Sequence, residues 1–168
     1  MPAILFVCSV NRFRSVIAEV KFRQLLSVRQ TLGSWTVGSA GTWAAAGLTP
    51  TLQARKYLES RGMDGSAIRS REVTRELLES ANLAVVMTRS QGESLTIEFS
   101  KLKNKVFLLS ELCGQGIFDV CDPMENPEIS WQEVGDEICS LLAAGFDQIC
   151  RKALQAEKRR LKKSGLKS

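Results

Sequence analysis

A cysteine and an arginine near the start of the chain stand at a spacing that suits phosphoryl transfer. Cys8 follows an apolar run, residues 3–7, that is typical of a buried strand, and Arg14 precedes a segment whose apolar residues recur at helical spacing. A strand-to-helix turn directs backbone N–H groups and a helix N-terminus at one point, which forms an anion site. A thiol in such a setting is held as a nucleophilic thiolate, and a guanidinium makes paired hydrogen bonds to phosphate oxygens. The motif therefore predicts transfer of a phosphoryl group to Cys8.

The turn between these two residues is expected to surround the phosphate, and the hydroxyl that follows Arg14 can donate a hydrogen bond to the thiolate. The residues predicted to bind substrate are Ser9, Val10, Asn11, Arg12, Phe13 and Ser15. The alternative interpretation is that Cys8 is a small core residue, as cysteines at the end of a buried strand usually are. The succession of strand, tight turn and helix favours the catalytic interpretation, because chance rarely supplies all three.

The length and composition of the chain predict one globular domain. It has 168 residues, 44% hydrophobic and 24% charged, which is enough for a real core. No apolar run approaches the 18 residues of a membrane span, and the first strand begins too early for a signal peptide. We therefore expect a cytoplasmic protein that does not bind membranes.

The content of cysteine and histidine excludes several kinds of chemistry. Five widely spread cysteines with no Cys-x2-Cys pair argue against a disulfide framework and a structural zinc site. The absence of histidine removes Ser-His-Asp and Cys-His catalysis and histidine-based metal sites. Proton transfer must then fall to carboxylates, Tyr57, lysines or cysteines. We expect no metal and no cofactor.

The net charge of +5 is concentrated near the end of the chain. Residues 158–168 hold six lysines and arginines, which is more often a solvated terminus than a binding arm. Nucleic-acid binding is not expected. The predicted organisation is one α/β domain over residues 1–157 and a basic tail over residues 158–168.

Four apolar segments alternate with segments of helical periodicity. The predicted strands are residues 3–7, 35–40, 82–87 and 105–109. The predicted helices are residues 16–26, 50–60, 74–80, 88–97 and 130–149. This alternation predicts a single-domain α/β fold in which a four-stranded parallel sheet carries helices on both faces. Ligands bind beyond the carboxyl ends of such strands, where Cys8 and Ser39 would both lie.

A thiolate that attacks phosphorus needs an acid to protonate the leaving oxygen, and Asp122 is the predicted acid. It lies in the loop after the last strand and precedes a proline that stiffens the turn. The alternative interpretation is an Asx-turn residue without catalytic function. Three neighbouring carboxylates could also serve, namely Asp119, Glu125 and Glu128.

Several segments together resemble the low-molecular-weight protein tyrosine phosphatase family. They are Cys-x5-Arg-Ser from Cys8, Ser-Ala-Gly-Thr at residues 39–42 and Asp-Val-Cys-Asp-Pro at residues 119–123. The resemblance covers residues 4–149. It implies a metal-free reaction in two steps, with Cys8 as nucleophile, Arg14 as phosphate clamp and Asp122 as general acid and then general base.

The same resemblance implies a supporting network around the loop. Asn11 would hold the loop in a left-handed conformation, Ser15 would stabilise the thiolate, and Ser39 would fix Asn11.

The chain departs from the family pattern at several positions. The family usually has glycine in place of Val10, so the backbone there is either ordinary or strained. It often has histidine in place of Ile68 and a second, protective cysteine in place of Phe13. Arg12 would add positive charge at the substrate entrance. The family's aromatic residues after Asp122-Pro123 are missing, which weakens the case for phosphotyrosine, although Trp43 could supply an aromatic wall.

Two other functions stay open at this point. A thiol-linked arsenate reductase uses the same scaffold, and Cys113 and Cys121 could relay electrons there. A non-catalytic anion-binding module could result from the valine in the loop. A phosphotyrosyl protein, a phosphoarginyl protein or a small phosphate ester would each suit the predicted phosphatase.

Overall fold

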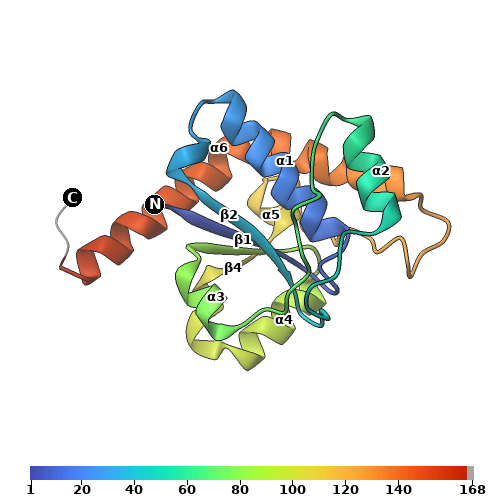
Figure 1. Cartoon of the computed structure of the whole chain (residues 1–168). Helices are drawn as coiled ribbons and strands as arrows, with labels where there is room; N and C mark the ends of the chain where they lie inside the picture. The colour runs from blue at the N-terminus through green and yellow to red at the C-terminus, as the bar shows by residue number, and fades with distance from the viewer. Residues whose placement is uncertain (166–168) are drawn as a thin grey trace.

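A four-stranded parallel sheet forms the centre of the computed structural model, which describes residues 1–165 (Figure 1). The strands lie in the order β2-β1-β3-β4, and every neighbouring pair is parallel. They are β1 (Ala3–Cys8), β2 (Thr36–Gly41), β3 (Leu83–Val86) and β4 (Val106–Leu108). The predicted single-domain α/β fold is therefore confirmed.

Helices cover both faces of the sheet, as Figure 1 shows. One face carries α1 (Arg14–Val28), α2 (Leu52–Ser60), α5 (Leu109–Leu112) and α6 (Trp131–Lys163). The other carries α3 (Arg75–Ser80), α4 (Arg89–Glu98) and the 3-10 helix η2 (Ser100–Lys105). A further 3-10 helix, η1 (Leu32–Ser34), precedes β2.

The alternation of side chains along β1 divides the core into two layers. Ile4, Phe6 and Cys8 belong to the cluster under α1 and α6, whereas Leu5 and Val7 belong to the cluster under α3 and α4. All residues of β1 except Ala3 are buried. This agrees with its sequence, which is apolar throughout, as in a strand that is covered on both faces. This alternation places the thiol of Cys8 on the α1 side of the sheet.

The carboxyl ends of β1 and β2 meet, because Cys8 pairs with Gly41 in the ladder. The loop after β1 passes directly over this glycine. A Cβ atom at Gly41 would lie 2.5 Å from the carbonyl oxygen of Ser9 and 3.0 Å from the backbone nitrogen of Asn11. Only glycine therefore allows the loop to rest on the end of β2.

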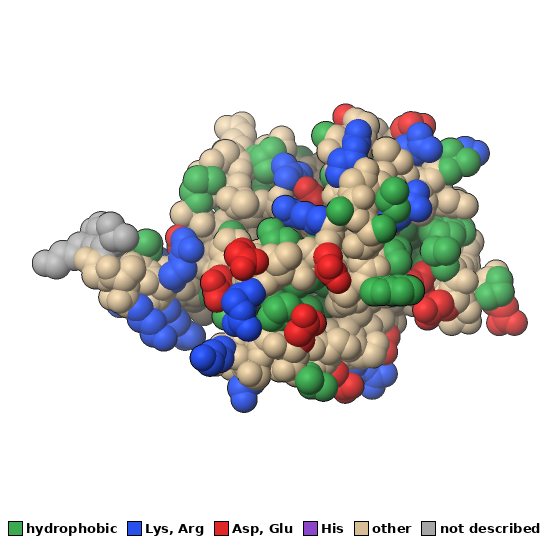
Figure 2. All heavy atoms as spheres, turned by 60° about the horizontal axis from the view of Figure 1, so that its bottom comes forward, with side chains coloured by type: hydrophobic (Ala, Val, Ile, Leu, Met, Phe, Trp, Pro, Cys, Tyr) green, Lys and Arg blue, Asp and Glu red, His purple; other side chains and the backbone are tan. Residues whose placement is uncertain are grey.

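The last helix extends well past its predicted end. α6 has 33 residues and continues to Lys163, so residues 158–163 of the predicted tail are helical; residues 166–168 lie outside the described part. Basic side chains in the last turn stabilise the C-terminal end of a helix. Figure 2 shows lysine and arginine side chains gathered near this end of the molecule. Within residues 1–165, no helix combines the length and the apolar character that a membrane crossing would need.

A buried carboxylate joins α6 to the start of the sheet, and we expect its loss to destabilise the protein. Glu157 accepts hydrogen bonds from Asn82, Arg160 and the N-terminal ammonium. Burial alone would raise the pKa of Glu157, but these hydrogen bonds lower it to about 2. The carboxyl of an unfolded chain titrates near ~4.3, so this stabilisation is complete above that pH and is lost as the pH falls towards 2.

We therefore expect Glu157→Gln to lower the free energy of unfolding at pH 7 by about 1–3 kcal/mol. Urea denaturation at pH 7 and at a pH near ~3 measures the effect, with the exposed Glu59→Gln on α2 as control. The difference between Glu157→Gln and the parent should shrink at the lower pH. An equal loss of stability at both pH values would contradict the assignment.

Candidate active site

The loop after β1 turns directly into α1, which begins without a side-chain cap. Phe13 occupies the N-cap position and makes no capping hydrogen bond, so the first N–H groups of α1 remain available for an anion. Asn11 has φ 55°, the left-handed conformation that the family resemblance implies. Val10 is not among the positive-φ residues, so the backbone at this departure from the family is ordinary.

A buried hydrogen-bond network connects the thiol to β2. The Sγ atom of Cys8 lies 3.0 Å from the hydroxyl of Ser15. The amide nitrogen of Asn11 donates to Ser15 and to Ser39, at 2.9 Å each, while its oxygen accepts from the backbone N–H of Arg71 at 3.0 Å. Since Asn11 donates to Ser15, the hydroxyl hydrogen of Ser15 is free to point at the sulfur. This direction of donation stabilises a thiolate.

The network continues to a second anion that the sequence analysis missed. The hydroxyl of Ser39 donates to the carboxylate of Glu19 at 2.6 Å, and Glu19 pairs with Arg23 at 2.9 Å. Glu19 is 6% exposed. Glu19 and Arg23 stand at positions i and i+4 of α1, and this spacing could have indicated their ion pair. It could not have indicated the hydrogen bond from Ser39 that joins Glu19 to the network of the loop.

Arg14 and Asp122 meet although 108 positions separate them in the chain. The guanidinium is 3% exposed and donates to the carboxylate of Asp122 at 2.5 Å, to the carbonyl of Val120 at 3.1 Å and to the hydroxyl of Ser9 at 3.4 Å. Asp122 also accepts from the backbone N–H of Met124, which is an Asx-turn bond. One oxygen of Asp122 therefore makes the Asx turn and the other contacts Arg14, whereas its role as the acid stays a prediction.

The competing carboxylates lie in different surroundings. Asp119 pairs with Arg89 at the surface, and this ion pair lowers the pKa of Asp119. Glu125 and Glu128 are exposed, and no hydrogen bond joins either side chain to the loop in the part of the chain that the structure describes. Of the four candidates, Asp122 alone contacts Arg14.

Gln91 is a second residue that the sequence analysis missed. Its side chain is 6% exposed and donates to the hydroxyl of Ser9 at 3.1 Å, while its oxygen accepts from the backbone N–H groups of Met87 and Thr88. Thr88 and Gln91 form the capping box of α4. The spacing Thr-x-x-Gln could have indicated the cap, but only the fold brings it to Ser9.

Two of the predicted substrate-binding residues, Arg12 and Phe13, contact different parts of the protein. Arg12 is half-buried, and its Nε atom donates to the carbonyl oxygen of Thr49 at 2.9 Å. The ring of Phe13 is 5% exposed and packs edge-on against Trp131, with ring centroids 4.8 Å apart. A contribution of Phe13 to substrate binding is therefore left to its backbone N–H.

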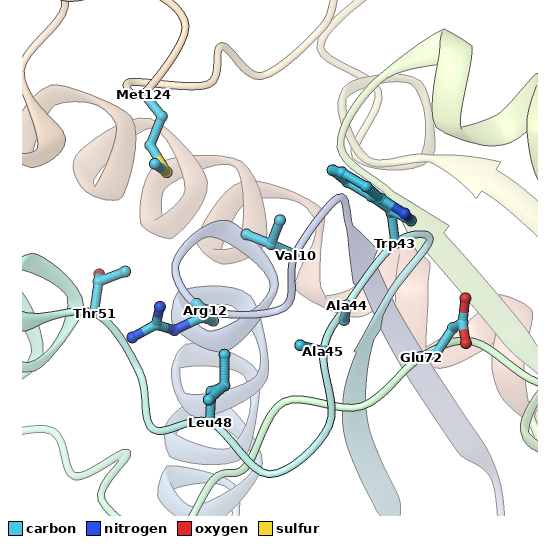
Figure 3. A pocket seen from close by; sticks show the side chains of 9 residues that line it. All are labelled: Val10, Arg12, Trp43, Ala44, Ala45, Leu48, Thr51, Glu72 and Met124. Carbon is cyan, nitrogen blue, oxygen red and sulfur yellow. The ribbon is translucent and has the colours of Figure 1, made fainter.

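A cavity of about 620 Å³ opens beside the loop. Figure 3 shows Val10 between Trp43 and Met124, with Arg12 and Leu48 along the adjoining wall. Trp43 and Met124 are 80% and 67% exposed, so they form the rim of the cavity. Trp43 lines one side of this cavity and Met124 the opposite side, and the role of Trp43 as an aromatic wall for the substrate stays a prediction.

Burial disfavours reaction at two of the other cysteines, Cys113 and Cys150. Burial raises the pKa of the Cys113 thiol to about 12 and that of Cys150 to about 11. Cys139 is half-buried, and the hydroxyl of Tyr57 donates to its sulfur at 3.5 Å. The sulfur of Cys121 accepts from the side-chain nitrogen of Asn126 at 3.0 Å. The described residues contain no cluster of three or more Cys, Asp or Glu side chains placed to hold a metal ion.

We expect the amide of Asn11 to be needed for the geometry of the loop. In Asn11→Gly the left-handed backbone is retained at little cost, so the change removes the side-chain hydrogen bonds alone. Turnover of an aryl phosphate should fall about 10- to 100-fold. Gln30→Gly is the matched control, because Gln30 is the other described non-glycine residue with positive φ (56°) and is exposed. Equal turnover in both variants would contradict the role of Asn11.

Comparison with known proteins places the chain in a family. The family model "Low molecular weight phosphotyrosine protein phosphatase" matches residues 3–160. A protein-arginine-phosphatase from Bacillus subtilis is 32% identical over 83% of this chain and 91% of its own length. The low molecular weight phosphotyrosine protein phosphatase of Rattus norvegicus is 29% identical over 79% of this chain and 85% of its own length.

A solved structure is similar to the whole fold. It is the YwlE arginine phosphatase as a cysteine-to-serine mutant with a phosphorylated active-site serine, at a TM-score of 0.77 and 30% identity, over 95% of this chain and 99% of that chain. This chain therefore belongs to the low molecular weight phosphotyrosine protein phosphatase family and is a cysteine-dependent phosphatase. The family and the enzyme class that the sequence predicts are confirmed.

Proposed function

We propose that this protein removes phosphate from phosphotyrosine side chains of proteins through a cysteinyl-phosphate intermediate. One observation carries the proposal: three groups of complementary chemistry meet at the loop after β1. They are the thiol of Cys8, hydrogen-bonded to Ser15, and the ion pair of Arg14 with Asp122. Binding of phosphate alone requires neither a nucleophile nor an acid.

In the first step the thiolate of Cys8 attacks phosphorus, and the bond between phosphorus and the tyrosyl oxygen breaks. Arg14 and the backbone N–H groups of residues 9–15 hold the three phosphate oxygens. Asp122 donates its proton to the departing oxygen, so that neutral tyrosine leaves. A bound phosphate competes with Asp122 for the guanidinium. The carboxylate that is released takes up a proton from water and then faces the leaving oxygen as the acid.

In the second step water attacks the phosphorus of the cysteinyl phosphate. The carboxylate of Asp122 takes a proton from the water, and the bond between phosphorus and sulfur breaks. Inorganic phosphate leaves, and the thiolate of Cys8 is restored with a hydrogen bond from Ser15. The proton taken from water restores Asp122 as the acid for the next cycle, and no electron is transferred.

The walls of the 620 Å³ cavity support an aryl phosphate as substrate. Val10, Leu48 and Met124 offer apolar surface, and the ring of Trp43 can pack against a tyrosyl ring. The guanidinium of Arg12 lines the same cavity and attracts acidic residues around the phosphotyrosine. The same charge repels the cationic guanidino group of a phosphoarginine.

Phosphoarginine is the second candidate, because the relatives from Bacillus subtilis and Geobacillus stearothermophilus are protein-arginine-phosphatases by name. One residue of the cavity favours it. The carboxylate of Glu72 lines the wall on the side of Trp43 and could pair with a guanidino group (Figure 3).

The test compares kcat/KM for two peptides that differ only in carrying phosphotyrosine or phosphoarginine. We expect a preference for phosphotyrosine of at least about 10-fold, which corresponds to ~1.4 kcal/mol. Arg12→Gln should reduce this preference about three- to tenfold, because it removes the charge that disfavours the guanidino group. A preference for phosphoarginine that Glu72→Gln abolishes would overturn the phosphotyrosine assignment and support the second candidate.

The partner would be a phosphorylated protein in the cytoplasm. All five cysteines are free in the structure, and a thiol nucleophile functions in a compartment that keeps thiols reduced. The arsenate reductase alternative needs Cys113 as a reactive thiol, and its burial and raised pKa argue against that use.

A further inference from the structure

A second cavity of about 480 Å³ lies behind the phosphate-binding loop, against the other end of the network that holds Cys8. Its lining includes Glu19, Arg23, Ser39, Asp64, Arg69 and Arg71. These residues come from α1, from β2 and from the segment between α2 and α3. The cavity of the proposed substrate shares none of them, so the two cavities are separate.

The charges of this second cavity favour an anion. It contains three guanidinium groups and two carboxylates. Both oxygens of Glu19 are occupied, one by Arg23 and one by Ser39, and Asp64 accepts from the backbone N–H of Ser66. Among the described residues, Arg69 and Arg71 form no ion pair and donate only to carbonyl oxygens. Their remaining N–H groups are therefore available to carboxylate or phosphate oxygens.

The wall of the second cavity is also part of the catalytic network. The side chain of Asn11 donates in both directions, to Ser15 beside the thiol and to Ser39 beside Glu19. The hydroxyls of Ser15 and Ser39 then face two anions, the thiolate of Cys8 and the carboxylate of Glu19. Arg71 contributes to the same network, because its backbone N–H donates to Asn11 and its Nε atom donates to the carbonyl of Ser39.

We propose that this second cavity is an effector site for a small polyanion, carrying two or more carboxylate or phosphate groups, whose binding weakens phosphate binding at the loop. An anion bound by Arg69 and Arg71 also competes with Glu19 for Arg23. It adds negative charge on the far side of Ser39 and leaves the charge of Glu19 less compensated. Both effects lower the affinity of the loop for a second anion, and coupling of this kind is reciprocal.

The test measures binding without turnover, so that its failure is distinct from a failure of the proposed function. Inorganic phosphate is titrated into the purified protein by calorimetry, at increasing fixed concentrations of citrate or of pyrophosphate. We expect the phosphate Kd to rise at least about fivefold and then to level off, as saturable coupling requires. Comparison of the two probes shows whether carboxylate or phosphate groups bind better.

Arg69→Gln should weaken the binding of citrate or pyrophosphate to the second cavity at least about fivefold and leave phosphate binding in their absence unchanged. Arg151→Gln is the matched control, since Arg151 is an exposed arginine on α6 that lines neither cavity. A phosphate Kd that rises linearly without levelling off would show competition at the loop and overturn the proposal. The same conclusion follows if neither probe changes the phosphate Kd, or if Arg69→Gln and Arg151→Gln behave alike.

Discussion

Cys8→Ser is expected to lower the turnover of para-nitrophenyl phosphate by at least about 10³-fold. The hydroxyl of serine is a weak nucleophile unless a base removes its proton, and this chain has no histidine to do so. The contacts of position 8 would otherwise change little, because serine and cysteine are similar in size. The variant should therefore bind inorganic phosphate within about threefold of the parent affinity, because the loss lies in the chemical step.

The measurement is made in the presence of a metal chelator, with Cys121→Ser as the matched control. Cys121 is half-buried in the same loop as Asp122, and its sulfur is held by Asn126. The proposed mechanism predicts nearly full turnover in this control, whereas an electron relay would require that thiol. Full turnover by Cys8→Ser would exclude the cysteinyl-phosphate mechanism. Absence of turnover in the parent protein would favour a module that only binds phosphate.

Asp122→Asn is expected to lower kcat for phosphotyrosine about 10²- to 10³-fold, because an amide cannot protonate the leaving oxygen. The variant should bind inorganic phosphate at least as tightly as the parent protein. In the parent protein the carboxylate of Asp122 pairs with Arg14 and competes with phosphate for its guanidinium. The neutral asparagine does not compete in this way.

A series of aryl phosphates with increasingly acidic phenols distinguishes general-acid catalysis from a structural effect. The loss of kcat in Asp122→Asn should shrink as the phenol becomes more acidic, because a good leaving group needs no proton. Asp119→Asn is the matched control: it removes one charge from the same loop, but Asp119 pairs with Arg89 at the surface. A loss that stays constant along the series would contradict the role of Asp122 as the acid.

The sequence by itself determined the layers of the fold and the local loop. The strand at residues 3–7 and the helix after Arg14 follow from apolar spacing within each segment, which neighbouring side chains decide. The cysteine, the guanidinium and the turn stand within seven consecutive residues, so the sequence alone shows these parts of the anion site. The predicted end of a helix was less accurate where the sequence has no glycine or proline to end it. The helix predicted to the region of Ile149 continues to Lys163, because neither proline nor glycine interrupts residues 146–163.

The tertiary structure alone decided which distant residues complete the site. Asp122 lies 108 positions from Arg14 and is one of four carboxylates in the same loop that look alike as sequence. Only the folded loop shows that Asp122, and not the other three, contacts Arg14. No periodicity in the sequence indicates the hydrogen bonds from Gln91 to Ser9 and from Ser39 to Glu19. They depend on the order of the strands and on the packing of α1 and α4. Side-chain direction was decided in the same way: Phe13 is buried because the turn into α1 points its ring at Trp131.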